Sequence, residues 1–136
     1  MSRPPVLGVD PGTRKCGVAV VAEPLGAPQA LEIIPTDQFG DRVVELVRRY
    51  GVRAIALGGG THAGPVGGLL RGLGLPVGIV DEYETTLQAR ARYFAANPPR
   101  GWRRLIPRGM LMPPRPIDDY AALLIAERYL LNEGAT

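Results

Sequence analysis

The feature that most constrains the fold is an acidic residue placed directly after a short apolar run. The stretch VLGVDPGTRKCGVAVV starts with small and β-branched residues, reaches Asp10, and continues after Pro-Gly-Thr into a second apolar run. Two apolar runs separated by turn residues predict adjacent strands, over residues 5–10 and 16–22. Asp10 could be a turn former, a phosphate anchor or a metal ligand. Turn chemistry alone explains poorly why an acid should end a central strand.

The rest of the chain alternates short apolar runs with helical patterns. A third strand is expected over 31–35, and buried strands over 53–57 and 77–80. Apolar spacing predicts helices over 41–50, weakly within 62–74, from Thr85 to about Ala96 and from about 117 to 132. Thr85 and Gln88 have the spacing of a capping box. This order predicts an α/β fold: a mixed five-stranded sheet with three antiparallel strands, then parallel crossovers, and helices on both faces.

The 136 residues fit a single domain, residues 1–136, which is long enough to bury its own core. Residues 97–116, NPPRGWRRLIPRGMLMPPRP, form an Arg/Pro-rich loop that predicts neither strand nor helix. Such long irregular segments are usually functional or disordered. We expect this loop to follow phosphates and to stack a base on its tryptophan, with a loose loop whose tryptophan packs on the domain as the alternative. The residues concerned are Arg100, Trp102, Arg103, Arg104, Arg108 and Arg115.

Cysteine usage and hydropathy indicate where the protein works. Cys16 is the single cysteine, which fits a reducing compartment and a buried thiol. The start of the chain lacks a signal-peptide pattern, and no apolar run approaches the ~20 residues of a membrane span. We therefore expect a cytoplasmic protein with no membrane segment. The formal net charge is +3, and Lys15 is the only lysine. Arginine suits phosphate contacts, although a GC-rich genome explains the composition equally well.

Acidic residues occur at three places where a strand ends or a helix begins. They are Asp10, the pair Asp81-Glu82, and the pair Asp118-Asp119. Each has a structural alternative, because an acid can end a strand in solvent or cap a helix. Taken together, carboxylates from separate elements are what a two-metal site for phosphodiester cleavage requires. The combination, rather than any single acid, favours a metal site.

Four segments, in order, resemble the blocks of the YqgF/RuvX family, small RuvC-like proteins of the RNase H superfamily. They are VLGVDPGTRKCGVAVV, AIALGGGTHAG, VDEYETTLQARARY and PIDDYAALLIAERYL. The resemblance covers nearly the whole chain. It implies a nuclease that requires Mg²⁺ or Mn²⁺ and binds structured RNA or branched or single-stranded DNA. The implied activity is processing of the 5′ end of pre-16S rRNA, or the cutting of Holliday junctions by similarity to RuvC.

Position by position, the resemblance assigns roles to particular residues. Asp10, Glu82 and Asp118 match the family's catalytic, metal-binding acids. Arg14 matches a basic residue of the first turn, and Thr85 and Thr86 match a hydroxyl pair. Thr13 and Lys15 flank Arg14 and are expected to contact nucleic acid with it. A two-fold homodimer would suit symmetric cutting of a junction.

The sequence also departs from the family pattern. The family's arginine after Asp-Glu is Tyr83 here, so Arg90 or Arg92 would have to replace it. Glycine stands where RuvC has an acid at the end of the fourth strand, and Ala121 stands where it has a second acid in the last helix. These departures leave open a weak or inactive nucleic-acid-binding module. A sugar-kinase-like or actin-like phosphate-binding module also shares the Asp-Pro-Gly-Thr turn, but such proteins need two domains.

Overall fold

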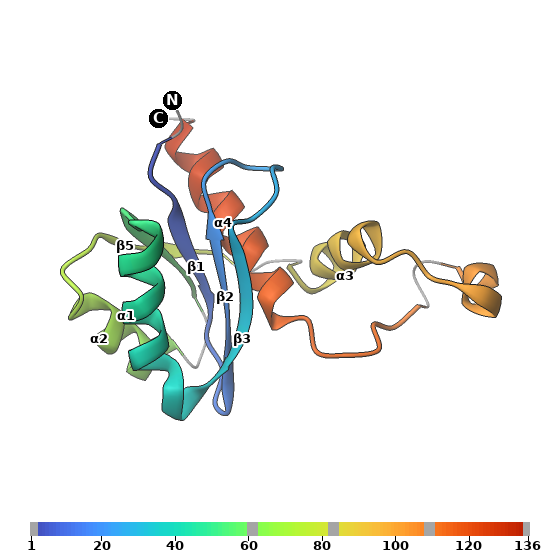
Figure 1. Cartoon of the computed structure of the whole chain (residues 1–136), viewed down its shortest axis with the longest axis horizontal. Helices are drawn as coiled ribbons and strands as arrows, with labels where there is room; N and C mark the ends of the chain where they lie inside the picture. The colour runs from blue at the N-terminus through green and yellow to red at the C-terminus, as the bar shows by residue number, and fades with distance from the viewer. Residues whose placement is uncertain (1–2, 60–62, 82–84, 108–110, 135–136) are drawn as a thin grey trace.

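The fold is a five-stranded mixed sheet in the order β3-β2-β1-β4-β5. The computed structural model describes residues 3–59, 63–81, 85–107 and 111–134 (Figure 1). Strands β1 and β2 pair antiparallel, as do β2 and β3, whereas β1–β4 and β4–β5 are parallel. This arrangement confirms the predicted fold class. The strands are β1 (Val6–Asp10), β2 (Lys15–Val21), β3 (Ala30–Pro35), β4 (Ala54–Gly58) and β5 (Val77–Val80).

The four predicted helices are present, with small differences at their ends. They are α1 (Phe39–Tyr50), α2 (Ala63–Arg71), α3 (Thr85–Ala96) and α4 (Asp118–Gly134). Two short 3-10 turns, η1 (Thr36–Gln38) and η2 (Gly101–Leu105), were not predicted. The expectation of no helix in 97–116 is therefore wrong over η2, because no proline interrupts the chain between Pro99 and Pro107 and one turn can form there.

Helices cover both faces of the sheet and bury a separate core on each. On one face, α1 and α2 pack Leu46 and Leu70 against Leu7 of β1. On the other face, α3 and α4 pack Phe94 and Leu123 against Val6. Alternate residues of a strand face opposite sides, so the inner strands are apolar along their whole length. Cys16 is fully buried in the first core, as expected.

Helix α4 lies directly on the backbone of the two central strands (Figure 1). A Cβ atom at Gly8 would lie 2.2 Å from the carbonyl oxygen of Ala122 and 2.8 Å from the Cβ atom of Ala126. Both distances are shorter than van der Waals contact. Glycine in β1 and alanine in α4 therefore let the helix approach closely, which fixes where its first turn stands.

Residues 97–117, here called the arm, join α3 to α4, and the described part of the arm projects away from the sheet (Figure 1). The arm carries η2, and its residues 108–110 lie outside the described ranges. Within those ranges, no helix combines the length and hydropathy that a membrane crossing requires.

Candidate active site

Asp10 and Asp118 are brought to the same edge of the sheet by the pairing of β1 with β2. Asp10 lies opposite Gly17 in the strand register. Asp10 also lies two residues after Gly8, so its side chain projects on the face that α4 covers. Asp118 is the first residue of α4. The sequence-predicted acids of β1 and α4 therefore flank one position, Gly17.

Gly17 provides the space in which the first turn of α4 sits. A Cβ atom on Gly17 would lie 1.9 Å from the carbonyl oxygen of Asp118 and 2.8 Å from the backbone nitrogen of Asp119. Because these are backbone atoms, no side-chain rotation would relieve the clash. Sequence reasoning did not identify this glycine. Its only signal was a glycine within a largely apolar strand, which often marks a close backbone approach.

The carboxylate of Asp118 has one oxygen that is not satisfied by hydrogen bonds. Its Oδ2 atom is buried and accepts no hydrogen bond. The nearest recorded charge is the ammonium of Lys15, whose Nζ lies 3.4 Å from Oδ2. Buried carboxylate oxygens are normally hydrogen-bonded or coordinated. A hard divalent cation is a chemically suitable partner for this oxygen, so the donor set fits a metal site.

The third expected acid, Glu82, lies outside the described residues, as does Tyr83. Among residues 3–59, 63–81, 85–107 and 111–134, no group of three or more His, Cys, Asp or Glu side chains is placed to hold a metal ion. Asp81 is exposed, and its backbone oxygen accepts a hydrogen bond from Arg128 at 2.6 Å. The described part of the site therefore contains two of the three expected ligands.

Residues expected to bind nucleic acid lie around this edge of the sheet and at the start of α3. Thr13 and Arg14 are exposed in the turn between β1 and β2, next to Lys15. Thr85 is buried as the first residue of α3, and Thr86 follows it. The Oε1 atom of Gln88 accepts a hydrogen bond from Arg128 at 3.2 Å.

Of the two arginines expected to replace the missing family arginine, Arg92 is engaged elsewhere. Its guanidinium forms an ion pair with Glu127, a buried residue of α4. Glu127 also accepts a hydrogen bond from the backbone nitrogen of Leu25 at 2.6 Å. Arg92 thus ties α3 to α4, and only the half-buried Arg90 remains as a candidate phosphate contact.

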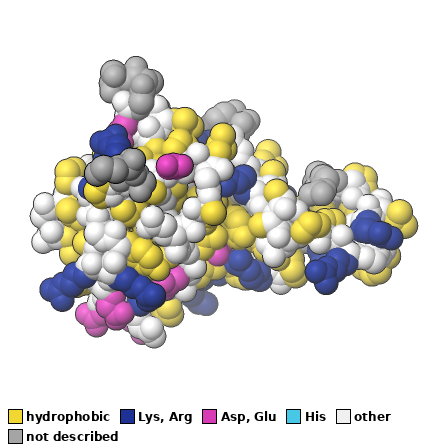
Figure 2. Space-filling model, turned by 45° about the horizontal axis from the view of Figure 1, so that its top comes forward, with side chains coloured by type: hydrophobic (Ala, Val, Ile, Leu, Met, Phe, Trp, Pro, Cys, Tyr) yellow, Lys and Arg dark blue, Asp and Glu magenta, His cyan; other side chains and the backbone are white. Residues whose placement is uncertain are grey.

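The arm presents basic and apolar side chains to solvent. Trp102 is 72% exposed and Leu105 is 87% exposed, so Trp102 does not pack on the domain. Figure 2 shows Lys and Arg side chains among hydrophobic ones along the arm, at the right of the view. Arg100 and Arg104 are exposed, and Arg103 donates a hydrogen bond to the Met112 carbonyl at 2.7 Å. Arg108 lies outside the described residues.

Arg115, which was expected to follow phosphates, binds Asp119 within the protein. Its two terminal nitrogens lie 3.2 and 3.3 Å from the carboxylate oxygens of Asp119, which is buried. This hydrogen-bonded pairing raises the pKa of the Arg115 guanidinium above its usual value. The guanidinium also lies 5.3 Å from the ring centre of Tyr93 and 5.8 Å from that of Tyr120. In the sequence, Arg115 and Asp119 have the i,i+4 spacing of a helical ion pair.

Arg115→Ala is expected to lower the free energy of unfolding by about 1–2 kcal/mol, because it leaves the buried Asp119 carboxylate unpaired. The loss is smaller than the ~3–5 kcal/mol of a fully buried pair, since the Arg115 side chain is partly exposed. Urea unfolding of the Arg115→Ala variant and of the wild-type protein measures this loss of free energy. Arg48→Ala, which removes an exposed arginine of α1, should change stability by less than about 0.5 kcal/mol. Equal stability of both variants would contradict the structural role of Arg115.

Comparisons with known proteins identify the family of the chain. No family model matches the chain. A "Putative pre-16S rRNA nuclease" of Pelotomaculum thermopropionicum is 34% identical, over 95% of this chain and 88% of the relative. The protein of the same name from Lacticaseibacillus casei is 36% identical, over 95% of both chains.

Solved structures give the same assignment of fold. Thermus thermophilus RuvC in complex with a Holliday junction substrate superposes with a TM-score of 0.66 and 23% identity, over 98% of this chain and 96% of RuvC. A second T. thermophilus RuvC structure superposes with a TM-score of 0.62 and 26% identity, over 95% of this chain and 94% of that RuvC chain. The chain therefore belongs to the YqgF family, whose curated members carry the pre-16S rRNA nuclease name, and it has the RuvC-like fold of the RNase H superfamily.

Proposed function

We propose that this protein is a divalent-metal-dependent nuclease that hydrolyses phosphodiester bonds at the 5′ end of pre-16S rRNA. The observation that carries the proposal is the position of Asp10 and Asp118 on either side of Gly17, with a buried oxygen of Asp118 that accepts no hydrogen bond. The name of the curated relatives supports the choice of substrate.

Asp10, Glu82 and Asp118 would hold Mg²⁺ or Mn²⁺. Bound divalent ions in such nucleases lower the pKa of the attacking water and stabilise the leaving oxygen. The protein's own part is to hold the carboxylates in place and to bring a phosphate beside them. The ammonium of Lys15 reduces repulsion among the acids before substrate binds. Metal affinity should be modest, because glycine and Ala121 stand where RuvC has further acids.

The phosphate backbone of the substrate would be bound by the turn after β1, the start of α3 and the arm. Thr13, Arg14 and Lys15 offer one hydroxyl and two cationic groups next to Asp10. The further candidates are Thr85 and Thr86 at the start of α3, and Arg90 within it. Arginine contacts to phosphates give affinity without sequence preference, so the site would recognise the form of the substrate more than its sequence. The arm contacts would come from Arg100, Trp102, Arg103, Arg104 and Arg108.

The first test is cleavage by the purified protein of three substrates: a precursor rRNA fragment, a four-way DNA junction and single-stranded DNA. Each is incubated with Mn²⁺, Mg²⁺ or EDTA. We expect metal-dependent cutting, with the rRNA precursor preferred. Preference for the junction would instead support resolution of Holliday junctions, the substrate in the RuvC complex. Binding of all substrates with no cutting under any condition would favour the non-catalytic alternative.

A further inference from the structure

Lys15 is the cation that the structure places against a candidate metal ligand. Its ammonium nitrogen lies 3.4 Å from the Oδ2 atom of Asp118, the buried oxygen that accepts no hydrogen bond. Lys15 stands two residues before Gly17 in β2, so its side chain projects from the face of the sheet on which the first turn of α4 packs. The ammonium and the start of α4 therefore meet on one face of the sheet.

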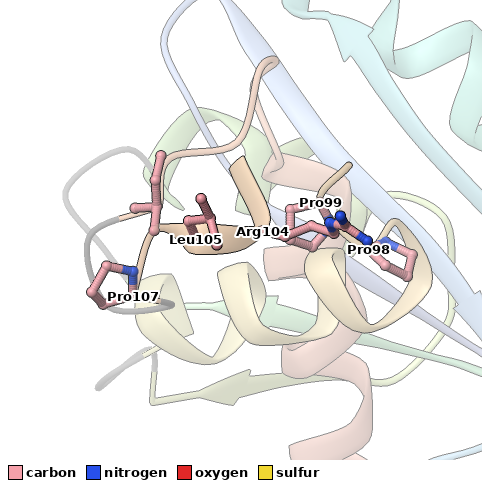
Figure 3. A pocket seen from close by; sticks show the side chains of 6 residues that line it. Pro98, Pro99, Arg104, Leu105 and Pro107 are labelled. Carbon is pink, nitrogen blue, oxygen red and sulfur yellow. The ribbon is translucent and has the colours of Figure 1, made fainter. Parts of the chain in front are cut away.

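The arginines of the arm do not take this place. Arg104 lines a cleft of about 530 Å³ on the arm (Figure 3), and the described part of the arm projects away from the sheet (Figure 1). Arg115 lies just before α4, but it pairs with Asp119. Within the ranges that the structure describes, the ion pair of Asp118 is formed with Lys15.

The pair between Lys15 and Asp118 is loose enough to exchange. The side chains are 43% and 35% exposed, so water solvates and screens both charges, and such pairs contribute little to stability. The ammonium of a lysine is carried by a flexible four-carbon stem, so it can move without moving β2. A stronger cation at Asp118 can therefore displace Lys15 at little cost to the fold.

A divalent ion on Asp118 and the ammonium of Lys15 would repel each other. Oxygen ligands lie about 2.0–2.6 Å from Mg²⁺ or Ca²⁺. Because the ammonium lies 3.4 Å from the same oxygen, the two cations would be at most about 6 Å apart. Coulomb repulsion at that distance favours the departure of the ammonium. A substrate phosphate brought to this edge of the sheet would give the ammonium a new negative partner.

We propose that Lys15 is an exchangeable counter-ion: it holds the Oδ2 atom of Asp118 in the metal-free protein and moves to a substrate phosphate when a divalent ion binds. The inference rests on the proposed function and adds a coupling between its metal and its substrate. A divalent ion should raise the affinity for RNA, and RNA should raise the affinity for the ion by the same factor. A lysine that only contacts phosphate, or only supports the fold, would not make this coupling depend on Lys15.

The first test measures binding of Mn²⁺ to the full-length protein without nucleic acid, from the electron paramagnetic resonance signal of free Mn²⁺. Lys15→Met removes the charge and should bind Mn²⁺ about ten-fold more tightly than wild type, because no ammonium competes at Asp118. Arg14→Met removes the same charge from the exposed neighbouring residue and should change the Mn²⁺ affinity by less than about three-fold, because solvent screens that charge. Equal effects of the two substitutions would overturn the inference.

The second test measures binding of a fluorescein-labelled single-stranded RNA in EDTA and in Ca²⁺ by fluorescence anisotropy, and a gel confirms that the RNA stays intact. In EDTA, Lys15→Met should bind the RNA within about two-fold of wild type, because Lys15 is engaged with Asp118. In Ca²⁺ it should bind about five-fold more weakly, because the wild-type ammonium then contacts a phosphate. Arg14→Met should weaken binding by a similar factor in both conditions, since Arg14 is exposed. A loss for Lys15→Met that is equal in EDTA and Ca²⁺ would contradict the exchange.

Neither measurement depends on cleavage, so the inference and the proposed function can fail separately. A protein that shows both effects of Lys15→Met but cuts nothing with Mn²⁺ or Mg²⁺ would support the exchange and contradict the nuclease function. A protein that cuts precursor rRNA, while Lys15→Met binds Mn²⁺ as wild type does, would support the nuclease function and overturn the exchange. Circular dichroism checks that both variants are folded, as expected for substitutions of partly exposed side chains.

Discussion

Asp10→Asn and Asp118→Asn are each expected to lower the rate of phosphodiester cleavage by about a thousand-fold or more, equivalent to about 4 kcal/mol of transition-state stabilisation. Each substitution keeps the size of the side chain and removes its negative charge. Asp10 lies opposite Gly17, and the backbone of Asp118 packs against Gly17, so the two residues lie in one small region. Rates are measured with saturating Mn²⁺ and precursor rRNA under single-turnover conditions.

A matched control is available for these two variants. Asp37→Asn makes the same change at an exposed position in η1 and should leave the rate within about two-fold of wild type. Circular dichroism and gel filtration check that all three variants are folded. If either site variant kept more than a tenth of the wild-type rate, that carboxylate would not be a metal ligand in the reaction.

Local patterns in the sequence predicted the elements and the fold class well, because both follow from short-range features. Apolar runs identify the strands, and the spacing of Val43 and Leu46 identifies α1, since burial on one face demands that spacing. The end of β1 was identified for the same reason, because Asp10 interrupts an apolar run. The expectation that Asp118 shares its edge came from the position of the acids at strand ends and at the start of the last helix, and the structure places the two residues on either side of Gly17.

Contacts between distant parts of the chain were not predictable from single-sequence patterns. Nothing in the sequence near Gly17 shows that Asp118, far along the chain, packs on it. The ion pair between Arg92 and Glu127 joins two helices and likewise has no local signal. Arg115 and Asp119 have the spacing of a helical ion pair, but Arg115 lies in the segment that was predicted to be neither strand nor helix. The carboxylate of Asp119 was predicted to be a metal ligand or a helix cap, whereas it binds an arginine.

The second large effect is expected at Gly17, where Gly17→Ala should lower the free energy of unfolding by about 3 kcal/mol or more. Inserting a methyl group into a packed interior costs about 1–3 kcal/mol when side chains can adjust. Here the added carbon would lie 1.9 Å from the backbone oxygen of Asp118, so the start of α4 has to move. That movement displaces Asp118, and any protein that remains folded should lose cleavage activity as well.

Gly68→Ala is the matched control, because Gly68 lies in α2 and a Cβ atom there meets nothing within 4 Å. It should stabilise the protein by about 0.5–1 kcal/mol, since alanine favours a helix interior over glycine. The two variants are compared by urea unfolding at one protein concentration. A Gly17→Ala protein as stable and as active as wild type would mean that α4 does not rest on β2 at this residue. The position of Asp118 near the end of β1 would then need another cause, because the close approach at Gly17 is what brings the first turn of α4 there.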